Sequence, residues 1–381
     1  MPAKKQSKSQ KFINGLFYTD QHFDYVTFFI IVFLVCFGLV MVYSTSSYKA
    51  TTTYGDPAYY VKRQAIVAIA GLVIMLIISN LNYRKWKNFT WLLYVLTVGL
   101  LVVVLAIGAS SHGAVRWIRF GSFQFQPSEV AKFVLILFTA HYATSRSRKL
   151  GKIKDLIAFM IVPIIPIGLV ATENLSTAIV CACIVVGILF VTSPLTVPFF
   201  AGGGLAAAAV YFILKLANDG NNYRWERIEV WQNIETHPKG YQTRQAMYAI
   251  GSGGLWGKGL GQSIQKMGFV PESHNDMIFS IVCEELGLFG AICIIAVFAL
   301  LIWRFMQIAN SAPDLYGALI VVGVLVHIAI QVLINIAVVT NTIPPTGVTL
   351  PFISYGGTSM LMLLAEMGLV LAVSRQIKYG R

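Results

Sequence analysis

The chain has 381 residues, of which 56% are hydrophobic and only 12% are charged. An average soluble domain carries about 25% charged residues, so this composition excludes a soluble enzyme and a disordered protein. The net charge is +13, and the five cysteines lie in apolar runs without a CxxC pair, which argues against a disulfide framework or a zinc site.

Apolar runs recur along the chain, and a run of ~20 residues can cross the ~30 Å hydrocarbon core of a bilayer as a helix. Lipid offers the backbone no hydrogen-bond partners, so such runs should be helical. The sequence therefore predicts an all-α, polytopic membrane protein with about ten transmembrane helices, or nine if a short run does not cross. The expected spans are Tyr25–Ser44, Gln64–Ser79, Phe89–Gly108, Ser128–Thr144, Leu156–Ala171, Leu175–Val191, Val197–Leu216, Met277–Trp303, Leu315–Val339 and Tyr355–Val373.

Residues 1–24 are polar and lack a small-residue cleavage site, so the first span is expected to be an uncleaved anchor. Most lysines and arginines share one side of the membrane if the N-terminus is cytoplasmic. This asymmetry predicts a multi-pass protein of the cytoplasmic membrane, with cytoplasmic tails at 1–24 and 376–381 around one transmembrane domain at 25–375. It also explains the basic charge without nucleic acid.

Residues 217–276 then form a long extracytoplasmic loop between the seventh and eighth spans. Loops of this length in compact proteins are usually functional. Aromatic and apolar residues alternate with charged ones between Tyr223 and Trp231. This stretch is either an amphipathic segment in the outer membrane interface or a simple surface excursion.

Charged side chains at membrane depth are costly and are therefore candidates for function. Pro127 and Ser128 suit the start of a helix, and Glu129 and Lys132 share one face of it because they are three residues apart. Two interpretations stay open. The pair either only neutralises buried charge or, as we favour, works near the outer surface.

Asp276 stands where the long outer loop enters the eighth expected span. A carboxylate at this place can simply cap the helix, because it lies at the positive end of the helix dipole. The same position also suits a base that meets a substrate at the membrane surface.

His327, Gln331 and Asn335 are four residues apart and form one polar stripe on the ninth span. Interhelical hydrogen bonding explains such a stripe better than catalysis does, although the stripe would still shape a cavity. Residues 344–359, which include Ser354, are too rich in proline and glycine for regular helix. Irregular backbone near a membrane lines a cavity or faces water, so this segment is either part of a site or a tight re-entrant turn.

The glycine-rich stretch 251–259 does not fit a nucleotide-binding loop. Ser252 occupies the first glycine position of that motif and Gly259 replaces its serine or threonine. Lys258 and Lys266 are expected either to contact anions and lipid headgroups or to be solvated charges.

Several of these stretches together closely resemble the SEDS family (shape, elongation, division and sporulation), which includes FtsW, RodA and SpoVE proteins. The resemblance runs from about residue 25 to 375 and is nearest to the FtsW-like branch, on the stretch from Ser263 to Lys266. Its most specific parts are Ile250–Leu255, Lys258–Gly261, Gln265–Lys266, Pro271–Glu272 with Asp276, Glu284–Gly287, Leu350–Gly357 and Gln126–Glu129.

The resemblance implies a peptidoglycan glycosyltransferase that polymerises lipid II at the outer face of the cytoplasmic membrane. Such proteins work with a class B penicillin-binding protein and with other division or elongation membrane proteins. Asp276 matches the family's essential acidic residue, and Glu129 and Lys132 match residues that line its central cavity. Arg116 and Trp117 match the arginine and tryptophan that precede this pair.

The chain departs from the family's common pattern at three asparagines. Asn174 stands where aspartate is frequent, Asn275 where threonine is frequent, and Asn341 where glycine is frequent. The first departure puts an acidic role at position 174 in doubt, whereas none of them removes the motif residues named above.

Lipid II is a disaccharide-peptide on a polyprenyl pyrophosphate, and joining two such units expels polyprenyl pyrophosphate. A sugar hydroxyl is a weak nucleophile, so a positioned base gains ~10²–10⁴ in rate. We predict that Asp276 is this base and that a single inverting displacement needs no covalent intermediate. A divalent cation, Mg²⁺ or Mn²⁺, is a candidate for stabilising the leaving group. The substrate-binding residues are predicted to be Arg116, Trp117, Glu129, Lys132, Lys258, Lys266, Gln331 and Ser354.

Two other functions remain open. A lipid II flippase would also need many helices, a polar cavity and broken segments, but its site should lie near the membrane midplane rather than at the outer surface. A non-catalytic scaffold for a class B penicillin-binding protein would not need acidic and basic residues that converge at the lipid surface.

Overall fold

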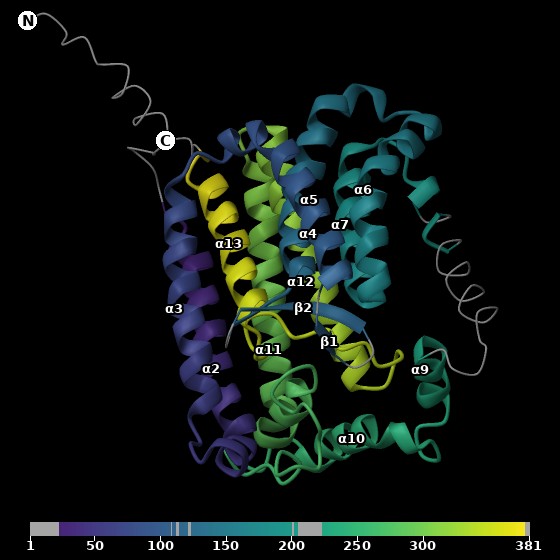
Figure 1. The fold of residues 1–381 in the computed structure, drawn as a ribbon. Coiled ribbons are helices and arrows are strands. Elements are labelled where there is room, and N and C mark those ends of the chain that lie inside the picture. Colours follow the sequence, from purple (N-terminus) through teal and green to yellow (C-terminus); the bar gives the residue numbers. More distant parts are fainter. Residues whose placement is uncertain are drawn as a thin grey trace, which may run out of the picture.

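The computed structural model describes residues 23–107, 109–111, 114–120, 123–199, 202–204 and 223–377. Its long helices lie side by side along one axis, and short helices cover one end (Figure 1). Seven helices of the described chain are long and apolar enough to cross a membrane. They are α2 (Tyr25–Tyr54), α3 (Tyr59–Asn80), α6 (Ile153–Glu173), α7 (Leu175–Thr192), α11 (Ile278–Ser311), α12 (Leu315–Val339) and α13 (Gly357–Ser374).

Two further helices, α4 (Thr90–Ile107) and α5 (Pro127–Arg146), lie where the third and fourth spans were expected. The prediction of a helical multi-pass membrane protein is therefore confirmed. The seventh expected span, Val197–Leu216, falls mostly outside the described residues.

The two ends of the described chain meet at one end of the bundle. The Arg375 guanidinium lies 4.8 Å from the centre of the Phe23 ring, and Arg304 forms an ion pair of 2.9 Å with Asp24. We call the opposite end, with the α2–α3 turn, the outer end after the predicted orientation. α2 has 30 residues, which is ~45 Å at ~1.5 Å per residue and exceeds the ~30 Å hydrocarbon core. Its last turns therefore extend beyond the lipid at the outer end.

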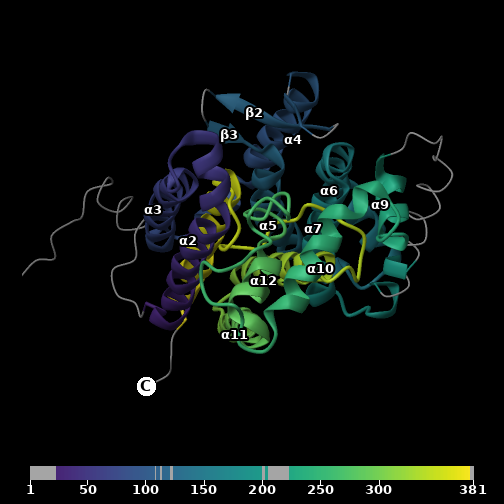
Figure 2. The same ribbon diagram turned by 90° about the horizontal axis from the view of Figure 1, so that it is seen from below.

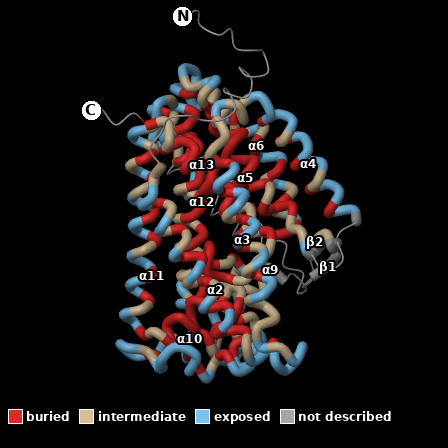
Figure 3. The backbone as a smooth tube through the Cα atoms, turned by 90° about the vertical axis from the view of Figure 1, so that its left-hand side faces the viewer, coloured by how far each residue is buried: buried red, intermediate tan, exposed pale blue. Residues whose placement is uncertain are grey.

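Helices α12 and α13 form the centre of the bundle. In the most apolar part of α13, 78% of the residues are buried, against 28% for α3, which faces the lipid. Buried residues concentrate along α5, α12 and α13 (Figure 3). Side chains on these three helices therefore meet each other rather than lipid.

A three-stranded antiparallel sheet, which the sequence analysis did not predict, connects α4 to α5. It consists of β1 (Ala109–Ser111), β2 (Ala114–Phe120) and β3 (Phe123–Phe125), with β2 in the middle. The Thr358 hydroxyl in the first turn of α13 donates a hydrogen bond of 3.0 Å to the Gln124 carbonyl. The sheet is thereby fixed to the central helix.

The long outer loop contains α10 (Tyr241–Gly253), which lies across the outer end, and α9 (Tyr223–Gln232), which lies at its edge (Figure 1 and Figure 2). The indole of Trp231 donates a hydrogen bond of 2.9 Å to the Asn341 carbonyl, and Val230 is buried. α9 therefore packs onto the segment that follows α12. Short 3₁₀ helices complete the described structure: η1 (Tyr83–Asn88), η2 (Ser147–Lys149) and η3 (Pro238–Gly240).

The eighth expected span, Met277–Trp303, is not one continuous helix, because Gly287 interrupts α11 with φ 67° and ψ −170°. A Cβ atom at Gly287 would lie 2.3 Å from the backbone nitrogen of Gly257, so only glycine permits this approach. The Leu288 amide donates a hydrogen bond of 2.9 Å to the Gly254 carbonyl. The short first part of α11 therefore holds the outer loop against the bundle.

Candidate functional site

Asp276 lies in the loop that leads into α11, next to the segment that follows α12. The Asn335 side-chain amide on α12 donates hydrogen bonds of 2.8 Å to the carbonyls of both Asp276 and Val348. Asp276 keeps partial exposure, whereas its Oδ1 atom is buried without a hydrogen-bond partner in the described part of the chain. This carboxylate oxygen is thus buried with no hydrogen-bond donor facing it in the described part of the chain.

The environment of Asp276 makes it a stronger base than an ordinary aspartate. Burial is the largest cause and the negative charge of Glu272 adds to it, which together raise the pKa of Asp276 to about 6. The positive charge of Arg227 on α9 acts in the opposite direction. At neutral pH the carboxylate is mostly ionised and still accepts a proton readily.

The loop around Asp276 is fixed on two sides. The Tyr355 amide donates to the His274 carbonyl at 2.9 Å, and the Ser273 hydroxyl donates to the Thr45 carbonyl on α2 at 3.2 Å. Glu272 adopts a left-handed backbone conformation, with φ 55°. Burial lowers the pKa of His274 to about 4, so this imidazole is neutral at physiological pH.

The predicted pair of Glu129 and Lys132 lies in the first two turns of α5, and the structure brings its members together. Their ion pair measures 2.9 Å between Lys132 Nζ and Glu129 Oε1, and both side chains are buried. Lys132 Nζ also donates to Gln331 Oε1 at 3.2 Å. Gln331 and Asn335 are one helical turn apart on α12, so this helix connects the Lys132 region to the Asp276 loop.

The polar stripe on α12 forms hydrogen bonds between helices and segments, as the sequence analysis favoured. Gln331 Nε2 donates to the Thr349 carbonyl at 3.0 Å, and His327 Nε2 lies 2.8 Å from Gln331 Oε1. His327 Nδ1 lies 2.7 Å from Glu366 Oε2 on α13. Glu366 therefore belongs to this cluster, which the sequence analysis missed.

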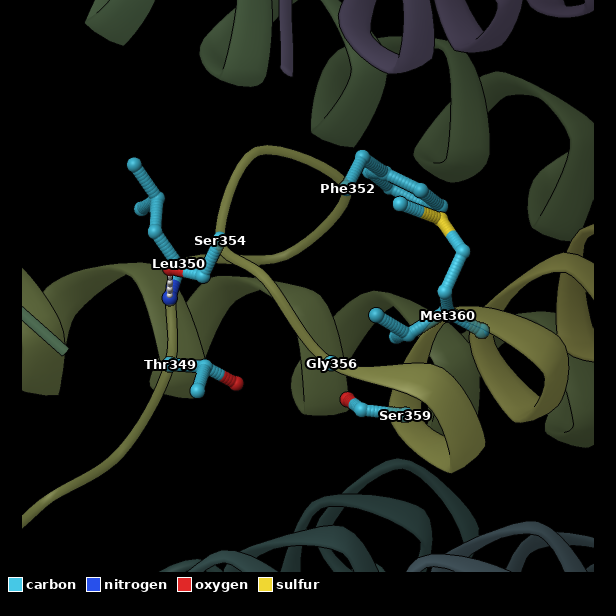
Figure 4. A pocket seen from close by; sticks show the side chains of 8 residues that line it. Thr349, Leu350, Phe352, Ser354, Gly356, Ser359 and Met360 are labelled. Carbon is cyan, nitrogen blue, oxygen red and sulfur yellow. Dashed lines mark hydrogen bonds between the residues drawn. The ribbon is translucent and has the colours of Figure 1, made fainter. Parts of the chain in front are cut away.

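The segment 349–356 borders a small cavity beside this cluster, whose volume of about 10 Å³ has room for about one water molecule (Figure 4). The Ser354 hydroxyl accepts a hydrogen bond of 2.8 Å from the Leu350 amide, which closes a tight turn at the cavity wall. Ser354 thus has a structural partner here besides any substrate. The cavity is lined by Thr349, Leu350, Phe352, Ser354, Gly356, Ser359, Met360 and Leu363.

Lys258 and Lys266 are paired with carboxylates on α11 and are not solvated charges. Lys258 Nζ lies 2.6 Å from Glu284 Oε1, and Lys266 Nζ lies 2.7 Å from Glu285 Oε1. These contacts hold the outer loop against α11 and neutralise both lysines. The predicted substrate contacts of the two lysines stay a prediction, and this pairing gives them no support.

Arg116 and Trp117 lie on β2, which contacts the N-terminal part of α5. Trp117 is partly exposed, whereas the side chain of Arg116 lies outside the described part of the structure. The cation that the structure does bring to Asp276 is Arg227, which also donates to the Thr346 carbonyl at 3.4 Å. Its place in the mixed aromatic and charged stretch of the outer loop was the signal for it.

Among the described residues, no three histidine, cysteine, aspartate or glutamate side chains gather closely enough to hold a metal ion. Mg²⁺ commonly uses one or two carboxylates together with substrate phosphates, so a cation would depend on the substrate for most of its ligands.

Comparisons with known proteins agree on one family. A family model described as a cell cycle protein of the FtsW, RodA and SpoVE type matches residues 25–379. A probable peptidoglycan glycosyltransferase FtsW of Trichlorobacter lovleyi is 38% identical over 367 residues, covering 93% of this chain and 94% of the relative. Stage V sporulation protein E of Bacillus subtilis is 38% identical over 369 residues, covering 93% and 98%.

One solved structure concerns the structural coordination of polymerization and crosslinking by a peptidoglycan synthase complex. A chain of that structure superposes on this chain with a TM-score of 0.77. It is 26% identical and covers 94% of this chain and 99% of that chain. The similarity in fold therefore extends over most of the chain.

Proposed function

This chain belongs to the FtsW/RodA/SpoVE family of cell cycle proteins, and from this membership and its site we propose that it is a peptidoglycan glycosyltransferase. Its substrate is lipid II, which it polymerises into glycan strands at the outer face of the cytoplasmic membrane. The observation that carries this proposal is the carboxylate of Asp276, which has one oxygen without a partner in the described structure and a pKa raised to about 6.

In the proposed reaction, Asp276 removes the proton from the 4-hydroxyl of the acceptor sugar. The oxygen attacks the anomeric carbon of the donor, the bond to the pyrophosphate breaks with inversion, and polyprenyl pyrophosphate leaves with the electron pair. A base with a pKa of about 6 is well suited to this transfer, because it is ionised at pH 7 and more basic than an ordinary aspartate.

Two cations are placed to oppose the negative charge that develops on the leaving pyrophosphate. Arg227 lies near enough to Asp276 to lower its pKa. Lys132 binds Gln331, which is one turn of α12 away from the asparagine that binds the Asp276 carbonyl. Fixed positive charges at such positions stabilise the transition state more than the ground state. Arg227 is therefore the first candidate for this role, and Lys132 the second.

A class B penicillin-binding protein is the proposed partner, because it would crosslink the strands that this chain makes. The support is the similarity to a chain of a solved peptidoglycan synthase complex whose description couples polymerization with crosslinking.

The test is the formation of glycan chains from purified lipid II in detergent, with a cognate penicillin-binding protein present. We expect polymer from the wild-type chain and a loss of about 10²-fold or more for Asp276→Asn, as removal of a general base predicts. Near wild-type turnover by a folded Asp276→Asn protein would contradict the proposed base.

The same assay addresses the flippase alternative, which one observation favours. The cluster of His327 and Glu366 lies at the middle of α12 (Leu315–Val339), where a transporter would place its site. Both side chains are fully buried and paired, so the cluster offers no open path. A flippase would produce no glycan in detergent, because there is no bilayer to cross.

A further inference from the structure

The buried pair of His327 and Glu366 fixes the position of a proton inside the bundle. His327 Nδ1 lies 2.7 Å from Glu366 Oε2, and the two residues are 1% and 0% exposed. A histidine nitrogen at this distance from a carboxylate oxygen needs one proton between them. Which further protons the pair holds follows from the next residue in the chain of hydrogen bonds, Gln331.

The orientation of the Gln331 amide is determined by its neighbours. Its Nε2 faces the Thr349 carbonyl at 3.0 Å, which can only accept a hydrogen bond. Its Oε1 faces Lys132 Nζ at 3.2 Å, which can only donate. The reversed amide would place oxygen against oxygen and nitrogen against nitrogen, so Gln331 Oε1 must point towards Lys132 and His327.

His327 Nε2 lies 2.8 Å from the same oxygen, so Nε2 must carry a proton and donate it. The proton between Nδ1 and Glu366 is then a second one, whether it resides on the imidazole or on the carboxyl. The pair therefore holds one proton more than a neutral histidine beside an ionised glutamate. Glu366 Oε1 has no hydrogen-bond partner within the described structure. This observation agrees with a neutral pair, because a buried oxygen without a partner costs more free energy when it carries negative charge than when the pair is neutral.

We propose that His327 and Glu366 form a proton-holding pair that positions Lys132 for the polymerase reaction. The second proton keeps His327 Nε2 a donor, and this donor keeps Gln331 Oε1 in place. Gln331 in turn holds Lys132 beside Glu129. His327 and Glu366 are thus positioning residues, and their role rests on the proposed function of this chain.

The charges around the pair agree with this assignment. The titratable groups that face it are Glu129 and Lys132 on α5 and the buried thiol of Cys181 on α7. Glu129 and Lys132 neutralise each other, and the proton makes the His327–Glu366 pair neutral as well. Without it, the interior would carry an uncompensated negative charge at membrane depth, which is costly.

Two matched pairs of variants test the positioning role in the lipid II polymerisation assay. Glu366→Gln and His327→Gln keep neutral hydrogen-bonding groups of similar size, whereas Glu366→Leu and His327→Leu remove them. We expect Glu366→Gln to stay within about threefold of wild-type kcat and Glu366→Leu to lose about tenfold or more with little change in KM, because misplaced groups lower the rate of the chemical step. His327→Gln should retain more activity than His327→Leu.

Two outcomes would overturn the proposal. Equal losses in Glu366→Gln and Glu366→Leu would show that a negative charge is needed rather than a shared proton. Wild-type activity in Glu366→Leu would show that the pair does not position Lys132. The unfolding midpoint of each variant in detergent identifies losses that come from misfolding.

A second measurement does not depend on activity. Nitrogen-15 solid-state NMR of histidine-labelled protein in lipid, with His327→Gln for assignment, reports which ring nitrogens carry protons at neutral pH. We expect a protonated Nε2 on His327, and a bare Nε2 would overturn the assignment. If the wild-type chain made no polymer and Nε2 were still protonated, the proposed function would fail while the proton assignment held.

Discussion

Asp276 and the pair of Glu284 and Glu285 lie at the outer end, fewer than ten residues apart in the sequence, and have opposite environments. Glu284 and Glu285 are surrounded by donors: Glu284 binds Lys258 at 2.6 Å and the Ile264 amide at 3.2 Å, and Glu285 binds Lys266 at 2.7 Å. Asp276 instead has Glu272 as a charged neighbour and one carboxylate oxygen without a partner in the described structure.

This difference separates a structural role from a reactive one. A carboxylate that already receives several charged and backbone hydrogen bonds is stabilised as an anion and has little tendency to take a proton. A carboxylate that is buried beside a second acid and receives few hydrogen bonds is a stronger base, and the pKa of Asp276 is raised to about 6 for these reasons. We therefore expect substitutions of Glu285 to change stability first, and substitutions of Asp276 to change turnover first.

The largest expected effect is on stability. Glu285→Ala would leave the Lys266 ammonium, whose side chain is 5% exposed, with the Ser44 hydroxyl as its remaining hydrogen-bond partner among the described residues. Breaking a buried ion pair in this way costs about 3–5 kcal/mol, which is measured as a lower unfolding midpoint in detergent. Lys49→Ala is the control, because its pair with Glu272 is exposed and long at 3.7 Å and should contribute less than ~1 kcal/mol. Equal shifts in both variants would contradict the contrast.

The next effect is on turnover without a loss of stability. Asp276→Glu keeps the carboxylate and moves it by one methylene, and a displacement of this size costs about 10²-fold in rate. We expect this loss in the initial rate of lipid II polymerisation, with the unfolding midpoint unchanged. A lower midpoint that accounted for the lost activity would assign Asp276 to the structural group instead.

A smaller effect is expected at Lys258. Its side chain is 29% exposed, and Glu284 keeps hydrogen bonds from Ser263, Ile264 and Gln265 without it. Lys258→Ala should therefore cost at most about 1.5–3 kcal/mol, the range for one hydrogen bond to a charged group. Polymerisation by this variant should stay near the wild-type rate. A loss as large as that of Asp276→Glu would mean that Lys258 contacts the substrate.

The sequence predicted the membrane fold well because the spans are long apolar runs. Charge in such a run made Glu129 and Lys132 conspicuous, and the place where the outer loop enters a span made Asp276 a candidate; their roles stay predictions. Glu366 carried the same signal in the last span, yet one acid in an apolar helix gives no indication of its partner. His327 is its partner only because α12 and α13 pack together at the centre of the bundle.

Other features depended on contacts that no local pattern shows. The break at Gly287 exists because the outer loop returns to that point, and the pairing of Lys258 and Lys266 follows from this return. Two of the three departures from the family pattern have simple local explanations. Asn341 adopts a φ of 55°, which asparagine tolerates almost as glycine does, and Asn174 caps α7 by accepting from the Ser176 amide at 3.0 Å.

The most direct test of Asp276 as the proton acceptor is the pH dependence of kcat for lipid II polymerisation. A base works only when ionised, so activity should fall as the pH drops through the pKa of about 6 that burial and Glu272 give to Asp276. His274, with a pKa lowered to about 4, stays neutral across this range. Glu272→Gln removes a negative charge that raises the pKa of Asp276, so the fall of kcat on the acidic side of the pH profile (its acidic limb) should move to lower pH. An acidic limb that stayed at the same pH in Glu272→Gln, or that persisted in the residual activity of Asp276→Asn, would contradict the account.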